Sequence, residues 1–183
     1  MGSNYEKRRY FVGIIKMKFA IIKTNVGEIK VELFTDKMPI TTSNFIDLAN
    51  SNFYDGIRFH RVINDFMIQT GDPLTKNVKL KSRWGTGGSK KIKDEFKHGL
   101  SNKKGTLAMA NTGVPNSGSS QFFINLANNS YLDFDKKPFA SKHPVFGNVI
   151  SGFEVIEKIS NFKVNRFDCP IEDIIIETIL IME

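Results

Sequence analysis

The chain has 183 residues, of which 40% are hydrophobic and 25% are charged, as in one globular domain with a substantial core. No stretch approaches the roughly 18 apolar residues that a membrane-spanning helix needs, so we expect no membrane association. The single cysteine, Cys169, excludes an internal disulfide and a zinc site built from several thiolates. The three histidines (His60, His98 and His143) lack the spacing of metal ligands, and we therefore expect no metal centre.

The net charge of +7 is unevenly distributed along the chain. Residues 76–104 contain only two acidic residues, Asp94 and Glu95. A basic segment of this kind is more often a solvated loop, but it is also a candidate surface for an acidic partner. Nucleic-acid binding through residues 76–104 is therefore one hypothesis, and it predicts an affinity that falls steeply with salt. The ten basic residues are Lys76, Lys79, Lys81, Arg83, Lys90, Lys91, Lys93, Lys97, Lys103 and Lys104.

Residues 1–16 are predicted to be an extension in front of a domain that spans residues 17–183. The extension carries basic residues before a short apolar patch, Tyr10 to Ile15, which Gly13 interrupts. This patch is too short for the hydrophobic region of a secretory signal, and no small-residue cleavage site follows it. We therefore expect a cytoplasmic protein, with the nucleus as the alternative.

The first predicted elements are two strands over residues 18–24 and 28–34, joined by a short turn that contains Gly27. In the second segment apolar and charged residues alternate, which is typical of a strand with one buried face. The tight connection predicts a β-hairpin. A helix is expected over about residues 40–50, after Pro39, because apolar residues recur there at helical spacing and Thr and Ser residues stand near its start.

The middle of the chain is rich in short apolar segments. Residues 57–70 contain many aromatic and β-branched residues, which favours strands. A long basic loop follows at residues 73–88. Further strands are expected over residues 106–110 and 121–126, and a loop dense in Gly, Pro, Asn and Ser separates them.

A second helix is predicted over about residues 152–160, where Ser151 and Glu154 fit a capping box. The C-terminal segment, residues 172–182, has the pattern of a strand. Many short strands, only two helices and no regular alternation of strand and helix predict a mainly β protein. The expected architecture is an antiparallel sheet closed into a barrel.

Most common catalytic motifs are absent from the sequence, including the nucleophile elbow, the P-loop and the paired histidines of zinc proteases. The glycine run at residues 85–88 does not follow a strand in a βαβ unit, so a dinucleotide site is weakly supported. Two carboxylate pairs, Asp94 with Glu95 and Asp133 with Asp135, are of the kind that a hydrolase uses. Such pairs more often solvate a turn.

The unusual feature is an arginine inside an apolar segment. Alternation along a strand would place Arg61 with Phe59 and Ile63 on one face, and His60 with Val62 on the other. An arginine among large apolar residues is either an ion-paired structural cation or a donor that faces a ligand. The residues around Arg61 leave both interpretations open.

Five blocks of this sequence resemble signature segments of the cyclophilins, and they occur in the order found in that family. The resemblance covers about residues 18–182, and the loops resemble those of compact, single-domain members. The blocks are FHRVI at 59–63, FMIQTGD at 66–72, LAMAN at 107–111, SQFFI at 120–124 and HPVFG at 143–147.

The resemblance implies a closed, eight-stranded antiparallel β-barrel capped by two α-helices. It also implies a peptidyl-prolyl cis-trans isomerase that acts on proline-containing peptides and proteins, assists folding and needs no cofactor. Arg61 resembles the catalytic arginine. The residues that resemble the walls of the proline pocket are Phe66, Met67, Phe123, Leu132 and His143. Those that resemble the groups holding the substrate backbone are Gln69, Ala110, Asn111 and Gln121.

The sequence departs from the family pattern at Tyr131, where many eukaryotic members have tryptophan. Tyrosine keeps a flat ring but loses the indole N–H and some contact area. We therefore expect cyclosporin-type ligands to bind less tightly while peptide turnover is retained. Two loops are also longer than in many members: residues 133–142, between Leu132 and His143, and residues 73–84, to which we assign no role.

A second hypothesis is a binding module, in which the same barrel docks a proline loop of a partner protein and turnover is incidental. A binder would keep the same pocket. The presence of Arg61 together with the pocket residues favours catalysis, because a donor aimed at the prolyl nitrogen binds the twisted peptide bond better than the planar one.

Overall fold

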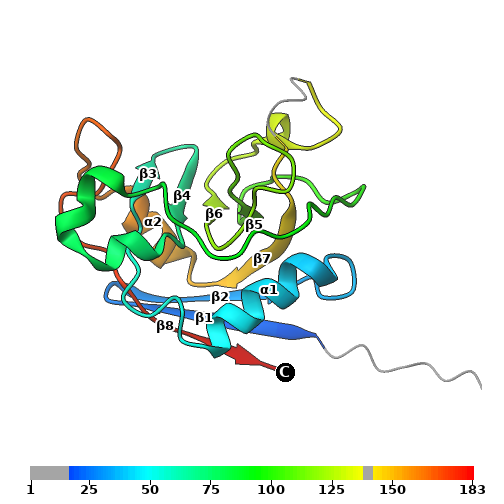
Figure 1. Cartoon of the computed structure of the whole chain (residues 1–183), viewed down its shortest axis with the longest axis horizontal. Coiled ribbons are helices and arrows are strands. Elements are labelled where there is room, and N and C mark those ends of the chain that lie inside the picture. The colour runs from blue at the N-terminus through cyan, green and yellow to red at the C-terminus, as the bar shows by residue number, and fades with distance from the viewer. Residues whose placement is uncertain (1–16, 138–141) are drawn as a thin grey trace, which may run out of the picture.

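The computed structural model describes residues 17–137 and 142–183, so the predicted N-terminal extension lies outside the described residues. Among the described residues, no helix has the length and apolar character needed to cross a membrane. Eight strands form a single sheet in the order β3-β4-β6-β5-β7-β2-β1-β8 (Figure 1). Their bounds are β1 Lys18–Thr24, β2 Gly27–Leu33, β3 Arg61–Ile63, β4 Met67–Thr70, β5 Thr106–Met109, β6 Phe122–Asn125, β7 Val145–Ser151 and β8 Ile176–Met182.

The sheet is an open, curled half-barrel, and the prediction of a closed barrel is wrong. Its edge strands are β3 and β8, and no ladder joins them. An isolated bridge between Arg58 and Ile175 spans the gap, flanked by hydrogen bonds such as Phe59 N to Ile174 O at 2.9 Å. Because β3 has three residues and the bridge is formed by the chain ahead of each edge strand, the contact is too short to continue as a ladder.

Most predicted elements are present. The hairpin of β1 and β2 is confirmed, and the two helices are α1 (Pro39–Asn50) and α2 (Phe153–Ser160). Helix α1 packs beside β8, and α2 beside β2, β3 and β4 (Figure 1). The predicted strand segment 57–70 is divided by a turn between β3 and β4, and β7 was not predicted. The long loop contains two 3-10 helices, η1 (Pro73–Lys76) and η2 (Val78–Arg83).

The predicted capping box of α2 does not form. The residue before the helix is Gly152, with φ of +89°, and no side chain caps the first turn. Ser151 is still the last residue of β7, so the chain must turn sharply at the next position to enter the helix. A left-handed φ of this size is accessible to glycine without the steric cost that a side chain would add.

Helix α1 is capped by a residue that is distant in sequence. Its own N-cap residue, Met38, offers no side-chain hydrogen bond. The carboxylate of Glu95 instead accepts hydrogen bonds from Ile40 N at 3.2 Å and from Thr41 N at 2.9 Å. It also accepts one from the Thr41 hydroxyl at 3.0 Å. Glu95 is therefore a structural residue, because it satisfies backbone donors that a helix N-terminus leaves free.

Strand alternation divides the apolar residues into two clusters. Ile68 of β4, Phe122 of β6 and Leu107 of β5 belong to the main core. Their neighbours along the same strands, including Met67 and Phe123, form a second cluster on the opposite face of the sheet. The sheet thus has one face for the core and another on which side chains can form a site.

The predicted grouping of Phe59 with Arg61 is wrong. Phe59 is 1% exposed and lies in the main core with Val62, whereas Arg61 is exposed. Regular alternation starts only at Arg61, where β3 begins, because the preceding residues pair with the chain ahead of β8. Ile63 does lie on the same side as Arg61 and packs against the second cluster.

The substitution Glu95→Gln tests the cap of α1. It removes the negative charge and one strong acceptor, so we expect the free energy of unfolding to fall by about 1 kcal/mol, as for loss of a helix cap. Urea denaturation gives this value. The matched control is Glu154→Gln, which changes an exposed acid in the first turn of α2. A loss no larger than that of the control would contradict the capping role.

Candidate functional site

The candidate site is built on one row of residues that runs across four strands. In the antiparallel register, Arg61 of β3 pairs with Gln69 of β4, and Gln69 pairs with Phe123 of β6. Phe123 in turn pairs with Ala108 of β5. Residues paired in register lie on the same face of a sheet, so the row places Arg61, Gln69 and Phe123 side by side.

A cavity of about 230 Å³ opens over this row. It is formed where the sheet face meets the loops that carry Asn111, Leu132 and His143. Nine of the eleven site residues expected from the sequence line it. They are Arg61, Phe66, Met67, Gln69, Ala110, Asn111, Phe123, Leu132 and His143.

The surroundings of Arg61 favour the interpretation as a donor that faces a ligand. Among residues 17–137 and 142–183, no carboxylate forms an ion pair with its guanidinium. Its Nη1 lies 3.5 Å from Gln69 Oε1, and its guanidinium carbon lies 6.0 Å from the Phe66 ring centroid. Arg58 shows the contrast, since its Nε lies 2.9 Å from Asp173 Oδ2. Arg61 therefore keeps free donors beside the cavity.

His143 forms one wall of the cavity and packs edge-on against Phe123, with ring centroids 5.3 Å apart. Its Nδ1 lies 2.9 Å from the carbonyl oxygen of Met109. Because a carbonyl oxygen only accepts, Nδ1 carries the hydrogen and Nε2 is left as an acceptor in the neutral ring. Burial lowers the pKa of His143, and the bond to Met109 offsets this only in part, so the ring is uncharged at neutral pH.

The side chain of Asn111 is already engaged within the protein. Its Nδ2 donates to the carbonyl of Lys142 at 2.6 Å, and its Oδ1 accepts from Gly113 N at 3.0 Å. The sequence predicted that this amide would pair with a substrate. Ala110 and Asn111 both line the cavity, and a contact between Asn111 and substrate stays a prediction.

The family model for cyclophilin type peptidyl-prolyl cis-trans isomerases matches residues 19–180. The chain belongs to the cyclophilin family. It is 44% identical over 146 residues to a peptidyl-prolyl cis-trans isomerase of Acinetobacter baylyi, covering 80% of this chain and 73% of that protein. It is 40% identical over 167 residues to peptidyl-prolyl cis-trans isomerase B of Escherichia coli, covering 87% and 97%.

A solved structure supports the same family. The cyclophilin type isomerase of Cryptosporidium parvum, crystallised in the presence of the dipeptide Ala-Pro, superimposes with a TM-score of 0.79 at 32% identity. The match covers 90% of this chain and 99% of that one. Fold and family are thus established over nearly all of the described residues.

Two of the residues carried over from the cyclophilins do not line the cavity. Tyr131 is 47% exposed and stacks on Phe66 at a centroid distance of 6.4 Å, so it lies at the rim. Gln121 is 9% exposed and lies behind Gln69, to which it is hydrogen-bonded at 2.9 Å.

The loop that carries Leu132 is held by a buried acid, for which the sequence indicated no such role. Asp133 is 5% exposed and accepts hydrogen bonds from Ser101 Oγ at 2.6 Å and from Asn102 N at 2.8 Å. Asn102 Nδ2 also donates to the carbonyl of His143 at 3.2 Å. The sequence grouped Asp133 with Asp135 as a carboxylate pair, but Asp133 is buried and engaged by these donors, whereas Asp135 is exposed.

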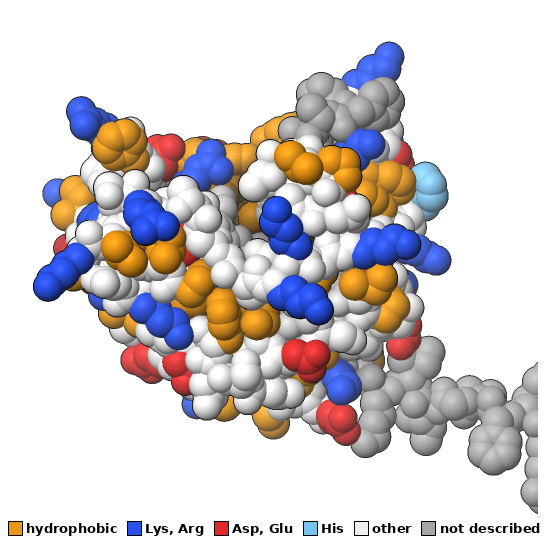
Figure 2. Space-filling model, viewed as in Figure 1, with side chains coloured by type: hydrophobic (Ala, Val, Ile, Leu, Met, Phe, Trp, Pro, Cys, Tyr) orange, Lys and Arg blue, Asp and Glu red, His pale blue; other side chains and the backbone are white. Residues whose placement is uncertain are grey.

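The basic residues of segment 76–104 are dispersed over the surface (Figure 2). All ten of its basic residues are exposed. On the face seen in Figure 2, Lys and Arg side chains are dispersed among apolar and uncharged surface. Its two acids are engaged, since Glu95 caps α1 and Asp94 accepts from Asn116 N at 2.7 Å. Nucleic-acid binding through this segment stays a prediction.

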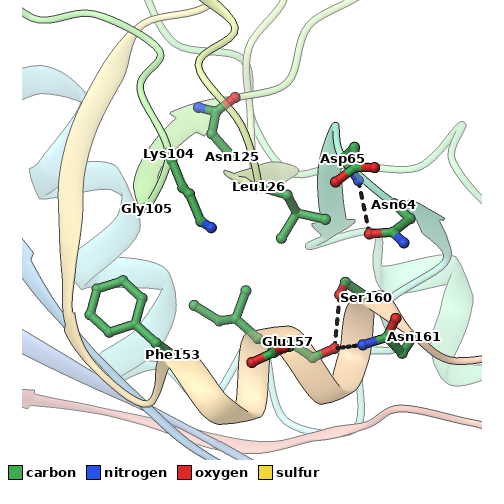
Figure 3. A pocket seen from close by; sticks show the side chains of 11 residues that line it. Asn64, Asp65, Lys104, Gly105, Asn125, Leu126, Phe153, Glu157, Ser160 and Asn161 are labelled. Carbon is green, nitrogen blue, oxygen red and sulfur yellow. Dashed lines mark hydrogen bonds between the residues drawn. The ribbon is translucent and has the colours of Figure 1, made fainter.

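A larger cavity, of about 570 Å³, lies away from the row, between α2 and the turn that joins β3 to β4. Leu126 points into it, and Lys104 reaches in from the opposite side to α2 (Figure 3). Ser160 and Asn161, at its α2 side, both donate to the carbonyl of Glu157 (Figure 3). None of the predicted site residues lines this cavity, so the smaller one is the candidate site of this cyclophilin.

The buried histidines predict a loss of stability in mild acid. Burial lowers the pKa values of both His60 and His143 in the folded state. The unfolded chain, with histidine pKa values of about 6.5, then takes up protons first as the pH falls. The stability gained from the neutral rings is complete above about pH 6.5 and is lost as the pH drops below that value.

Urea denaturation between about pH 7.5 and 5 measures this dependence. We expect His143→Gln to make the stability less dependent on pH. His98→Gln is the matched control, because the His98 side chain is 81% exposed and the same substitution there leaves the buried rings in place. An equal pH dependence in the wild type and the His143 variant would contradict the assignment.

Proposed function

We propose that this cyclophilin catalyses rotation about Xaa-Pro peptide bonds of protein substrates, with Arg61 as the catalytic residue. One observation carries the proposal: a guanidinium that pairs with no carboxylate of the described residues stands in the same cross-strand row as Phe123, at the edge of a cavity that Met67 and Leu132 also line. In this proposal the proline ring occupies the cavity over Phe123, Met67 and Leu132. Arg61 then reaches the nitrogen of the bond that rotates.

Isomerisation requires stabilisation of a twisted amide and no covalent intermediate. The barrier of roughly 18–20 kcal/mol comes from amide resonance. Shortening the time constant of cis-trans exchange from tens of seconds to milliseconds requires about 10⁴-fold acceleration, or roughly 5–6 kcal/mol of transition-state stabilisation. As the bond twists, the prolyl nitrogen becomes pyramidal and regains a lone pair, which a donor binds better than the planar nitrogen.

The surroundings of Arg61 suit this role. Arginine stays protonated at every physiological pH and offers several donors in a fixed plane. The apolar walls exclude water, which strengthens a hydrogen bond to the developing lone pair. In this proposal Gln69 and Asn111, which both line the cavity, hold the substrate chain on either side of the bond. The peptide bond can then rotate while the substrate chain on either side of it is held.

The first test replaces the proposed catalytic residue. Arg61→Ala should reduce the catalysed rate of Xaa-Pro isomerisation by roughly 10²-fold or more, as when a donor to a developing charge is removed. Arg166→Ala removes an exposed arginine elsewhere and should leave the rate unchanged. A protease-coupled peptide assay measures both.

The outcomes separate the isomerase from a binding module. A wild-type protein that binds a proline peptide without accelerating its exchange would favour the module. Full activity in Arg61→Ala would contradict the proposed role of the guanidinium. Circular dichroism of each variant establishes that any lost activity does not reflect unfolding.

A second test concerns Tyr131, for which we propose a weakened contact with cyclosporin-type ligands. Tyr131→Trp adds contact area and an indole N–H at the rim of the cavity. It should therefore raise cyclosporin affinity, by about tenfold if one hydrogen bond and its packing are gained, while peptide turnover changes little. Titration calorimetry measures the affinity. Equal affinity in both proteins would contradict the proposal.

A further inference from the structure

A chain of side-chain hydrogen bonds runs from a glycine turn to Arg61. Gln121 Nε2 donates to the carbonyl oxygens of Gly85, at 3.0 Å, and Gly87, at 2.7 Å. Gln121 Oε1 accepts from Gln69 Nε2 at 2.9 Å. Gln69 Oε1 then faces Arg61 Nη1 at 3.5 Å. Two glutamine amides therefore connect the turn to the guanidinium.

The donor and acceptor of each hydrogen bond in this series follow from the two glycine carbonyls at its start. Backbone carbonyls accept hydrogen bonds and never donate, so Gln121 must present its NH2 group to the two glycines. Its oxygen is then turned towards Gln69, which must present its own NH2 group. Only the oxygen of Gln69 is left to face Arg61. The glycine carbonyls thus determine that Arg61 meets an acceptor.

The glycine turn is held in place by a buried carboxylate. Asp72 is 0% exposed, and its Oδ2 accepts hydrogen bonds from Gly85 N and, at 3.2 Å, from Gly87 N. Its Oδ1 accepts from Leu74 N at 2.8 Å. A Cβ atom on Gly87 would collide with Asp72 Oδ1, so the close approach of carboxylate and turn requires glycine there.

We propose that Gln121 and Asp72 are positioning residues for isomerisation, an inference that rests on the proposed function. Asp72 fixes the turn, and Gln121 transmits the orientation of the turn to Gln69. Gln69 Oε1 then holds the guanidinium of Arg61 at the edge of the cavity. Gln121 acts from behind the site, because its NH2 group is engaged by the glycines and it does not line the cavity.

The substitutions Gln121→Glu and Gln121→Met test this role. An ionised glutamate would be repelled by the two glycine carbonyl oxygens. Burial beside these oxygens therefore raises the pKa of the new carboxyl. When protonated, the same carboxyl can donate to a glycine carbonyl and accept from Gln69, which restores the chain of bonds. Methionine fills a similar space but forms neither bond.

The measurement determines peptide affinity and the rate of exchange on the enzyme separately, by NMR line-shape analysis across a range of pH. For both variants near pH 8 we expect the rate to fall about tenfold, as for loss of a hydrogen bond to a charged group, with affinity within about twofold of wild type. Gln121→Glu should regain activity relative to Gln121→Met as the pH falls. Because His60 interacts with Gln121, both variants are also measured in a His60→Gln background, in which a pH difference between them cannot come from the imidazole.

Three results would overturn the proposal. The first is a wild-type rate in Gln121→Met. The second is a loss of affinity that parallels the loss of rate, which would mean that Gln121 binds the substrate directly. The third is the same pH profile in the glutamate and methionine variants.

Asp72→Asn provides an independent test if a Gln121 variant does not fold. The asparagine NH2 group would face backbone N–H groups on one side, so the turn should loosen and the rate should fall at unchanged affinity. A wild-type rate in this variant would overturn the proposal. Inactivity of the wild-type protein itself would instead refute the proposed function, so the two failures are distinguishable.

Discussion

The site depends on the register of four short strands. Arg61, Gln69, Phe123 and Ala108 share one row because β3, β4, β6 and β5 pair without a shift at these positions. A slip of one residue in β4 would bring Ile68 to the outer face and bury Gln69 in the core. The main core and the candidate site are therefore two consequences of the same pairing, since Val62, Ile68 and Ile124 occupy the next row on the opposite face.

Polar anchors between distant segments hold the loops around this row. Glu95 caps α1, and Asp72 binds the glycine turn. Asp133, which directly follows η3 (Ser130–Leu132), binds the backbone at Asn102. Each carboxylate accepts backbone N–H groups from its partner segment. Such groups are costly to leave unsatisfied when buried. The anchors thus give long loops defined positions at the edge of a small cavity.

The elements that could be predicted from the sequence are those that local residue patterns determine. Alternation and turn residues located the hairpin of β1 and β2, and helical spacing located α1. The position of α2 was predicted from a capping box, although the box itself does not form. The resemblance identified nine residues that the structure brings around one cavity. The open edge between β3 and β8 was missed, because strand closure depends on where distant segments meet. The anchors were missed for the same reason: Asp72 preceding Pro73 indicates a cap, but nothing local names its partners Gly85 and Gly87.

The central claim is that a proline ring over Phe123 places its peptide bond at Arg61, where it rotates. Exchange spectroscopy of an Ala-Pro peptide with a catalytic amount of the protein tests this most directly. We expect exchange peaks between cis and trans signals, together with nuclear Overhauser contacts between the proline ring and Phe123. Contacts without exchange, or exchange that persists in Arg61→Ala, would contradict the account.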